Sequence, residues 1–210
     1  MEFDIYAIII YNIPSFIRQF VTILSINKTR EEMDAVRPFF IAMRKNIRFT
    51  THAALIGALY VALCYLQNML LPGSASWAIQ FRAAEALCVL ALFTPAAIGG
   101  LTIGCLLFNI SFAGALPLDF LVGTAASLLA AWGMYLTRRI TIKGYPLLAM
   151  TLPALANAFL VGWELSVYIG GGFWLNAIYV AIGELAVLLT LGSALFYALK
   201  ARNLHTRLFD

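Results

Sequence analysis

The chain has 210 residues, of which 62% are hydrophobic and only 11% are charged, and its formal net charge is +4. Soluble globular domains carry about 25% charged residues, so this composition excludes a soluble enzyme, a disordered tail and a nucleic-acid-binding protein. The basic residues stand in separate clusters, a pattern typical of membrane proteins, whose orientation depends on such clusters. We therefore expect an all-α integral membrane protein with one compact domain.

The first residues of the chain differ in composition from the rest. Residues 1–47 contain five of the ten acidic residues, and the run 16–26 is apolar enough to rest against a membrane surface. We interpret 1–47 as an N-terminal extension that is cytoplasmic or lies at the membrane interface. The remaining residues, 48–210, are then expected to form the membrane domain.

Apolar runs that are long enough to cross a bilayer follow in chain order. A transmembrane helix needs about 20 predominantly apolar residues. Four runs meet this requirement, at 53–71, 119–136, 147–169 and 173–199. Each of these four runs predicts one transmembrane helix.

The stretch 83–111 is harder to interpret, because as one helix it would be about 43 Å long, well over the thickness of the hydrocarbon core. It contains Pro95 and then two consecutive glycines. It is therefore either one long broken helix or a hairpin of two short helices, 83–93 and 96–111.

The basic clusters decide between these two arrangements. The positive-inside rule places clusters of Lys and Arg in the cytoplasm. The hairpin places all three clusters on one side, whereas a single span would put the last two outside. We therefore predict a six-transmembrane-helix bundle with cytoplasmic N and C termini. The clusters are Arg44/Lys45/Arg48, Arg138/Arg139/Lys143 and Lys200/Arg202/Arg207.

A few ionisable and polar side chains fall inside these spans or at their edges. A charged side chain at the centre of a span costs about 2.5–3.5 kcal/mol on insertion scales, so such residues are typical of functional sites. Arg82 and Glu85 are spaced i,i+3, and Asn157 and Glu164 are spaced i,i+7, so each pair shares a helix face. Glu184 lies deeper. Polar faces must turn away from lipid, which predicts a polar pocket that opens outward.

Several of these residues also have simple structural interpretations. Arg82 and Glu85 are either a salt bridge at a helix start or part of a site. Asp119 either caps a helix N-terminus or contacts a ligand. Asn157 either bonds to a neighbouring helix or lines the pocket.

Small residues form a stripe on the first span. Ala54, Ala58 and Ala62 are spaced i,i+4,i+8, which lets another helix approach closely. The stripe fits packing inside the bundle as well as it fits a surface for a partner.

We expect neither a metal site nor a cofactor. Cys64, Cys88 and Cys105 lie in apolar runs without metal-ligand spacing, and His52 and His205 are isolated. The sequence has no GxxxxGK[ST] phosphate loop, so the chain itself does not hydrolyse ATP. If it concentrates a solute, the energy comes from a partner or an ion gradient.

Polar motifs beside the spans carry a resemblance to a known family. The chain resembles the QueT family, the substrate-binding S components of energy-coupling factor transporters that are assigned to queuosine precursors, over roughly residues 51–199. The matching segments are Ile-Gln-Phe-Arg-Ala-Ala-Glu-Ala-Leu (79–87), Phe-Thr-Pro-Ala-Ala-Ile (93–98), Gly-Cys-Leu (104–106), Asp119, Pro153, Asn157, Phe-Trp (173–174) and Gly-Glu-Leu (183–185).

The resemblance implies a six-helix protein of the cell membrane that binds its solute from outside. It also implies partners, namely a transmembrane T component and two cytoplasmic ATPase subunits. The stripe Ala54/Ala58/Ala62 is similar to the Ala-x-x-x-Ala surface by which S components dock on the T component. No nucleic acid is expected as a partner.

The implied substrate suits the residues. Queuosine precursors are deazaguanines, whose N1–H and 2-amino groups can donate to one carboxylate, while the 6-oxo group needs a donor. An aminomethyl form carries a cation that a second carboxylate would favour, and aromatic rings would stack on the base. The candidate site residues are Glu164 and Glu85, then Glu184, Asp119, Arg82, Gln80, Asn109 and Asn157, with Trp163, Trp174 and Phe81 for stacking.

Other functions stay open at this point. One is an S component for another vitamin-like solute, and another is a self-sufficient ion-coupled carrier of a nucleobase-like solute. The absence of an evident inverted repeat weakens the carrier. A membrane assembly protein with a lipid or protein ligand is a third. An enzyme has the least support, because no nucleophile–base set is visible.

Overall fold

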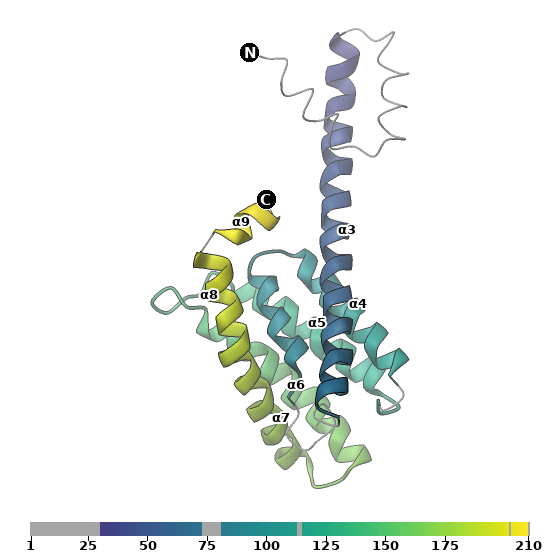
Figure 1. Ribbon diagram of the computed structural model, residues 1–210, viewed down its shortest axis with the longest axis vertical. Coiled ribbons are helices and arrows are strands. Elements are labelled where there is room, and N and C mark those ends of the chain that lie inside the picture. Colours follow the sequence, from purple (N-terminus) through teal and green to yellow (C-terminus); the bar gives the residue numbers. More distant parts are fainter. Residues whose placement is uncertain (1–29, 73–80, 113–114, 202, 210) are drawn as a thin grey trace. The chain divides into compact units, whose positions relative to one another are not determined.

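The computed structural model of the chain describes residues 30–72, 81–112, 115–201 and 203–209 (Figure 1). Contacts divide the chain into two units, Met1–Arg48 and Phe49–Asp210. In the described ranges the regular elements are helices, and an isolated bridge joins Ile142 to Tyr145. The expectation of an all-α chain is therefore confirmed over this part of the sequence. The site described below lies within the second unit.

Nine helical elements follow one another in the described part of the chain. They are α3 (Arg30–Leu70), η1 (Ala83–Leu92), α4 (Ala96–Ser111), α5 (Asp119–Thr137), α6 (Leu147–Tyr168), α7 (Phe173–Val187), η2 (Leu188–Gly192), α8 (Ser193–Ala201) and α9 (Leu204–Phe209). The first differs from expectation, because α3 is already helical at Arg30, well before the expected start of the span at 53.

Four helical stretches in the described ranges are long and apolar enough to cross a membrane. They are Phe40–Leu70, Asp119–Thr137, Leu147–Tyr168 and Phe173–Ala201. Their outer faces expose large apolar side chains, as on α5, where Leu121, Trp132 and Leu136 are each more than half exposed. Soluble monomers rarely expose apolar surface so continuously, whereas a lipid environment favours it.

The stretch 83–111 forms two helices joined by a short turn. η1 is a 3₁₀ helix, and Phe93 and Thr94 close it by donating their backbone N–H groups to the Leu90 carbonyl. At the rises of the two helix types, η1 is about 20 Å long and α4 about 24 Å, less than the roughly 30 Å of a hydrocarbon core. Most of η1 is buried, which agrees with a helix that is apolar on nearly all sides.

Glycines bring α3 and α4 into close contact. A Cβ atom built on Gly100 would lie 2.5 Å from the backbone oxygen of Ala53, and one on Gly104 would lie 2.8 Å from that of Gly57. Only glycine fits such an approach. The alanine stripe, in contrast, is exposed on α3. Within the described bundle the glycines form the internal contact, whereas Ala54, Ala58 and Ala62 are exposed, so their role as a partner surface stays a prediction.

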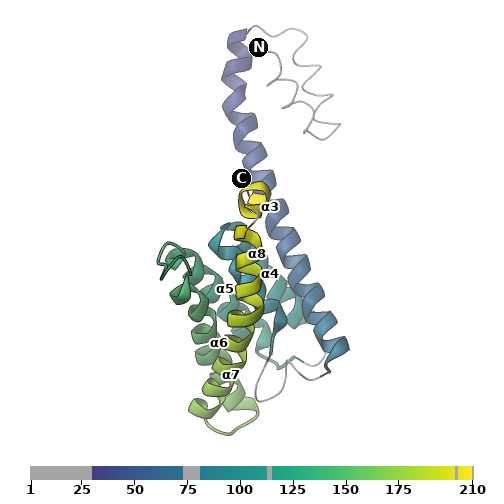
Figure 2. The same ribbon diagram turned by 60° about the vertical axis from the view of Figure 1, so that its left-hand side comes forward.

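The last long helix is interrupted. A single helix was expected over 173–199, but residues Leu188–Gly192 form a π-helical turn between α7 and α8. Both ribbon views show α8 continuing the line of α7 (Figures 1 and 2). Ser193 donates to the Leu188 carbonyl at 3.4 Å, and Gly192 lies close to the side chain of Val89 in η1. This wider turn depends on tertiary contacts that an apolar run does not reveal.

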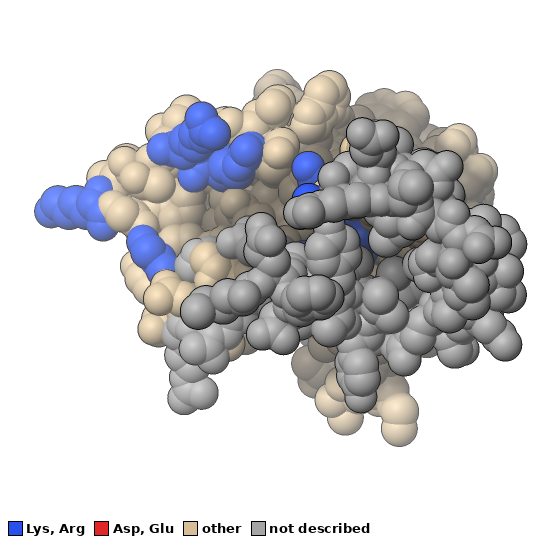
Figure 3. All heavy atoms as spheres, turned by 90° about the horizontal axis from the view of Figure 1, so that it is seen from above, with Lys and Arg blue, Asp and Glu red and all other residues tan. Residues whose placement is uncertain are grey.

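Two long-range contacts place several chain reversals at one end of the second unit. Lys200 Nζ donates to the carbonyl of Gly144, 3.2 Å away, in the loop between α5 and α6. Phe93 stacks on Phe196 with ring centroids 5.9 Å apart, which brings the turn after η1 to the same end. The basic clusters at 138–143 and at Lys200 therefore lie together. On the face shown in Figure 3, the charged side chains visible on described residues are basic.

Candidate ligand-binding site

Three charged residues meet where their helices begin or end, and we call them the outer tier: Arg82, Asp119 and Glu164. Arg82 precedes η1, Asp119 is the first residue of α5, and Glu164 lies about four residues, roughly 6 Å, before the end of α6. Arg82 Nη2 lies 3.8 Å from Asp119 Oδ1, and both side chains are 11% exposed. The charges of Asp119 and Arg82 both act on Glu164.

Glu164 is the most unusual member of the outer tier. Its side chain is fully buried, and among the described residues neither carboxylate oxygen has a hydrogen-bond donor. The nearby carboxyl group of Asp119 does not supply a donor, because two ionised carboxylates cannot bond to each other unless they share a proton. A buried charge without a donor costs several kcal/mol. Glu164 therefore offers two acceptors for which a ligand's N–H groups would be suitable partners.

The proposed pairing of Arg82 with Glu85 is not what the structure shows. Arg82 has extended backbone (φ −100°, ψ 94°) and lies outside the helix, so the i,i+3 rule does not apply, and its ion pair is with Asp119. Glu85 instead accepts hydrogen bonds from Tyr60 Oη at 2.7 Å and from Cys88 Sγ at 3.3 Å. Tyr60 and Glu85 are each 1% exposed, so this group is fixed inside the bundle.

A second group, the inner tier, consists of Glu85, Glu184 and Asn157. Glu184 lies about eleven residues, roughly 16 Å, along α7 from its start, so it is deeper than Glu164. The charge of Glu85 acts on it, and the side chain of Asn157 lies near it. In the part of the chain that the structure describes, Glu184 Oε2 and Asn157 Nδ2 make no hydrogen bond. The inner tier thus holds a buried acceptor and a buried donor that are both available.

Arg82 connects the two tiers. The charges of Asp119 and of Glu85 both act on its guanidinium group. Among the described residues, four acidic side chains are buried, and Arg82 is the cation that faces them. This interior therefore has an excess of negative charge when its carboxyl groups are ionised. Such a site can accept N–H donors and can hold a cation.

Two of the expected site residues have structural partners. Asn109 donates through Nδ2 to the backbone carbonyl of Asp119 at 2.8 Å, in a space that exists because Gly123 has no side chain. Asp119 Oδ2 accepts the backbone N–H of Leu116 at 2.8 Å. Asp119 therefore stabilises the start of α5 with one oxygen while the other faces Arg82. Asn109 fixes α4 to α5 beside the outer tier.

The aromatic candidates lie elsewhere. Phe81 is 43% exposed, Trp163 48% and Trp174 70%, so the structure does not bring them to the buried carboxyl groups. Neighbouring positions on a helix point about 100° apart, so the face that buries Glu164 turns Trp163 outward. Stacking by these three residues stays a prediction. Gln80 lies outside the described residues.

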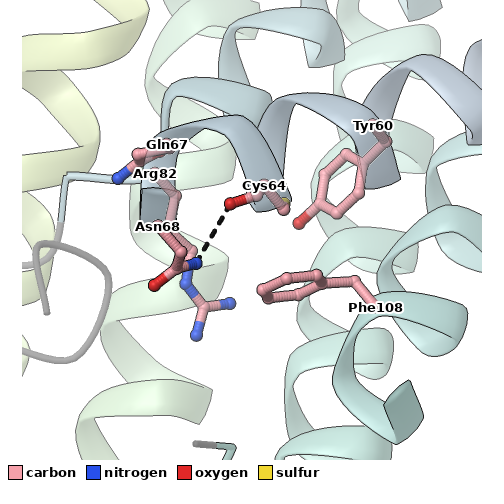
Figure 4. Close-up of a pocket in the computed structure, with 6 residues that line it drawn as sticks. All are labelled: Tyr60, Cys64, Gln67, Asn68, Arg82 and Phe108. Atoms are coloured by element: carbon pink, nitrogen blue, oxygen red, sulfur yellow. Dashed lines mark hydrogen bonds between the residues drawn. The ribbon is translucent and has the colours of Figure 1, made fainter. Parts of the chain in front are cut away.

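A small pocket adjoins Arg82 between α3 and α4 (Figure 4). Its cavity volume is about 10 Å³, room for about one water molecule. Gln67 Oε1 accepts the backbone N–H of Ala83 at 2.7 Å, so α3 helps to position the start of η1. The pocket is lined by Tyr60, Cys64, Gln67, Asn68, Arg82 and Phe108.

Sequence reasoning did not identify the contribution of α3 to this region. Tyr60, Cys64, Gln67 and Asn68 are spaced i,i+4,i+7,i+8, so they follow one face of the helix. That spacing could have indicated an inward polar face on the first span. The alanine stripe occupies another face of the same helix.

The apolar outer faces of the second unit, around buried ionisable side chains, are typical of an integral membrane protein. The family model described as QueT transporter matches residues 50–201, so the chain belongs to the QueT transporter family. The suspected kinship is thus confirmed, and the chain is a membrane transport protein. No curated protein and no solved structure matches the chain.

Proposed function

We propose that the chain is the membrane-embedded substrate-binding (S) subunit of an energy-coupling factor importer. It captures a queuosine precursor, a 7-deazaguanine base or derivative, from outside the cell for ATP-driven uptake by partner subunits. The family match supports the transporter class. The observation that carries the ligand chemistry is Glu164, whose two oxygens are buried near Arg82 without donors from the described residues.

The ligand's polar edge matches the outer tier. A guanine-type ring presents N1–H and the 2-amino group side by side, and one carboxylate accepts both in a charge-assisted pair. In our proposal Glu164 takes this role, and Arg82 donates to the 6-oxo group. Binding supplies Glu164 with the hydrogen bonds that it lacks in the free protein, so the cost of burying it is offset.

The proposed topology has six membrane crossings, with both termini in the cytoplasm and the outer tier toward the exterior. Support comes from two basic clusters at one end of the second unit. The outer tier lies near the start of η1, the start of α5 and the end of α6. The basic clusters follow the other end of α5 and the end of α8, so the outer tier is at the opposite end of the bundle. η1 and α4 would make their crossings as a short hairpin inside the bundle.

We expect Glu164→Gln to weaken binding of 7-deazaguanine by about 10- to 100-fold, because a hydrogen bond to a charged group contributes about 1.5–3 kcal/mol. Isothermal titration calorimetry on the purified protein in detergent measures the change. Ser166→Ala is the matched control, since Ser166 lies on the same helix and its hydroxyl donates to the helix's own Trp163 carbonyl.

Two results would contradict this function. Absence of binding of any deazaguanine by folded wild-type protein would remove the substrate. Uptake by the chain alone in liposomes under an ion gradient would instead identify a self-sufficient carrier, because an S subunit needs its ATPase partners. We expect the isolated chain to bind the deazaguanine and not to transport it into liposomes.

The exposed alanine stripe supports docking on a transmembrane T component. Ala58 is exposed in the middle of the stripe, so Ala58→Trp should block association through steric overlap and leave ligand binding unchanged. Co-purification with the T component and the two ATPases measures association. Leu59→Trp is the control, because Leu59 is exposed on an adjacent part of α3. Equal loss with both variants would exclude a role specific to the stripe.

A further inference from the structure

We propose that the loop between α5 and α6, together with the end of α8, binds the phosphate headgroup of an anionic phospholipid. The site is formed by Lys143 in the loop and by Lys200 on α8, and we call these two residues the lysine pair. Such a lipid site is separate from the buried carboxyl groups, and it does not depend on the solute that the protein carries.

A tight two-residue turn in the loop holds Lys143 in an unusual conformation. Ile142 donates its N–H to the Tyr145 carbonyl at 2.9 Å, and Tyr145 donates its N–H to the Ile142 carbonyl at 3.0 Å. Between them Lys143 has φ 51° and Gly144 has φ 79°, and two positive φ values are typical of a type I′ turn. The first position of such a turn favours asparagine, aspartate or glycine. Turn formation alone therefore does not explain a lysine there.

The second lysine lies directly against this turn. Lys200 Nζ donates to the Gly144 carbonyl at 3.2 Å and lies 5.5 Å from the centroid of the Phe196 ring. An ammonium group has three N–H donors, so Lys200 keeps donors for a further partner. Lys143 is the residue before Gly144, and both lysines are exposed. Two positive charges are thus presented from neighbouring points of one surface.

No acidic side chain of the described second unit neutralises the lysine pair. The acidic residues in the described ranges of this unit are Glu85, Asp119, Glu164 and Glu184, and all four are buried. The ion pair formed there joins Asp119 to Arg82, at the other end of α5. On the face shown in Figure 3 the charged side chains visible on described residues are basic. This surface therefore calls for an anion from outside the described chain.

The side chains around the lysine pair are those expected at the depth of lipid headgroups. The ring of Tyr197 is exposed and stacks on that of Tyr145 with centroids 6.0 Å apart, and tyrosine is enriched at membrane interfaces. Ile142, next to Lys143 in the turn, is 59% exposed. Exposed apolar and basic side chains together are typical of surfaces that lie at the boundary of headgroups and acyl chains. This combination favours a phospholipid as the partner.

The charge of the headgroup should decide which phospholipid binds. Phosphatidylglycerol carries a net negative charge on its phosphate, whereas the choline of phosphatidylcholine neutralises that charge within the headgroup. A lysine near an anionic membrane surface strengthens binding about fivefold. Two lysines should therefore favour phosphatidylglycerol by about 10- to 30-fold.

The test titrates the detergent-solubilised full chain with each of these two lipids, carrying the same acyl chains, and counts bound lipid by native mass spectrometry. We expect wild-type protein to show the preference for phosphatidylglycerol given above. Lys143→Asn should lower the affinity for this lipid about fivefold and leave that for phosphatidylcholine unchanged. Because asparagine suits the turn better than lysine, this variant should unfold in neutral detergent at the wild-type temperature or above it.

Lys45→Gln is the matched control, because it removes the same charge from an exposed position of α3. It should keep the wild-type affinity for phosphatidylglycerol. Equal affinities of wild-type protein for both lipids, or equal losses with Lys143→Asn and Lys45→Gln, would overturn the lipid site. Inorganic phosphate that binds as tightly as phosphatidylglycerol would identify a site for a free anion instead. Loss of co-purifying ATPase subunits from Lys143→Asn, at unchanged lipid affinity, would show that the surface binds a partner protein.

Discussion

Arg82→Met is expected to abolish ligand binding and to destabilise the folded protein by about 3–5 kcal/mol, the usual effect of removing one partner of a buried ion pair. The substitution leaves Asp119 without its ion pair and takes the nearest cation from Glu164 and Glu85. Thermal unfolding of the detergent-solubilised protein measures the stability, and calorimetry with 7-deazaguanine measures the binding.

Two further variants separate the role of Arg82 in folding from its role in recognition. Arg139→Met removes an arginine that is exposed after α5. It should change neither the stability of the folded protein nor its ligand affinity by a measurable amount. The double variant Arg82→Met/Asp119→Asn should recover part of the stability, because it also removes the uncompensated charge, but it should not recover binding. A single Arg82→Met variant that stays fully stable and binds normally would refute this account of the site.

Gly100→Ala is expected to destabilise the bundle by about 1–3 kcal/mol, as overpacking of a tight core does. The new Cβ would lie 2.5 Å from the backbone oxygen of Ala53, and backbone cannot rotate away as a side chain can. α3 must therefore move away from α4. Because α3 carries Tyr60, which donates to Glu85, the ligand affinity should fall together with the stability.

Gly99→Ala is the matched control for this prediction. It changes the next residue of the same helix in the same way, but its Cβ would have no atom within 4 Å. Alanine is a better helix former than glycine by up to about 1 kcal/mol, so this variant should be as stable as wild type or more stable. Thermal unfolding of both variants side by side checks the prediction. Equal effects would show that close approach of α3 and α4 is unimportant.

The amino-acid sequence by itself determined the class of protein and much of its helical organisation. The scarcity of charge and the long apolar runs indicate a membrane protein, and Pro95 with the following glycines marks the break between η1 and α4. Helical periodicity also predicted that Asn157, Glu164 and Glu184 turn inward, and all three are buried. These properties are local, because hydropathy, helix breakers and periodicity are read along one segment at a time.

The tertiary structure decided which residue meets which. Arg82 pairs with Asp119 instead of Glu85, and Glu85 is bound by Tyr60, whose contribution the sequence did not reveal. Glycines, not the alanine stripe, bring α3 against α4. Such pairings join residues far apart in the chain, and they depend on the rotation of each helix about its axis and on its depth in the bundle. Periodicity shows that a side chain points inward, but only packing determines the partner that it finds there.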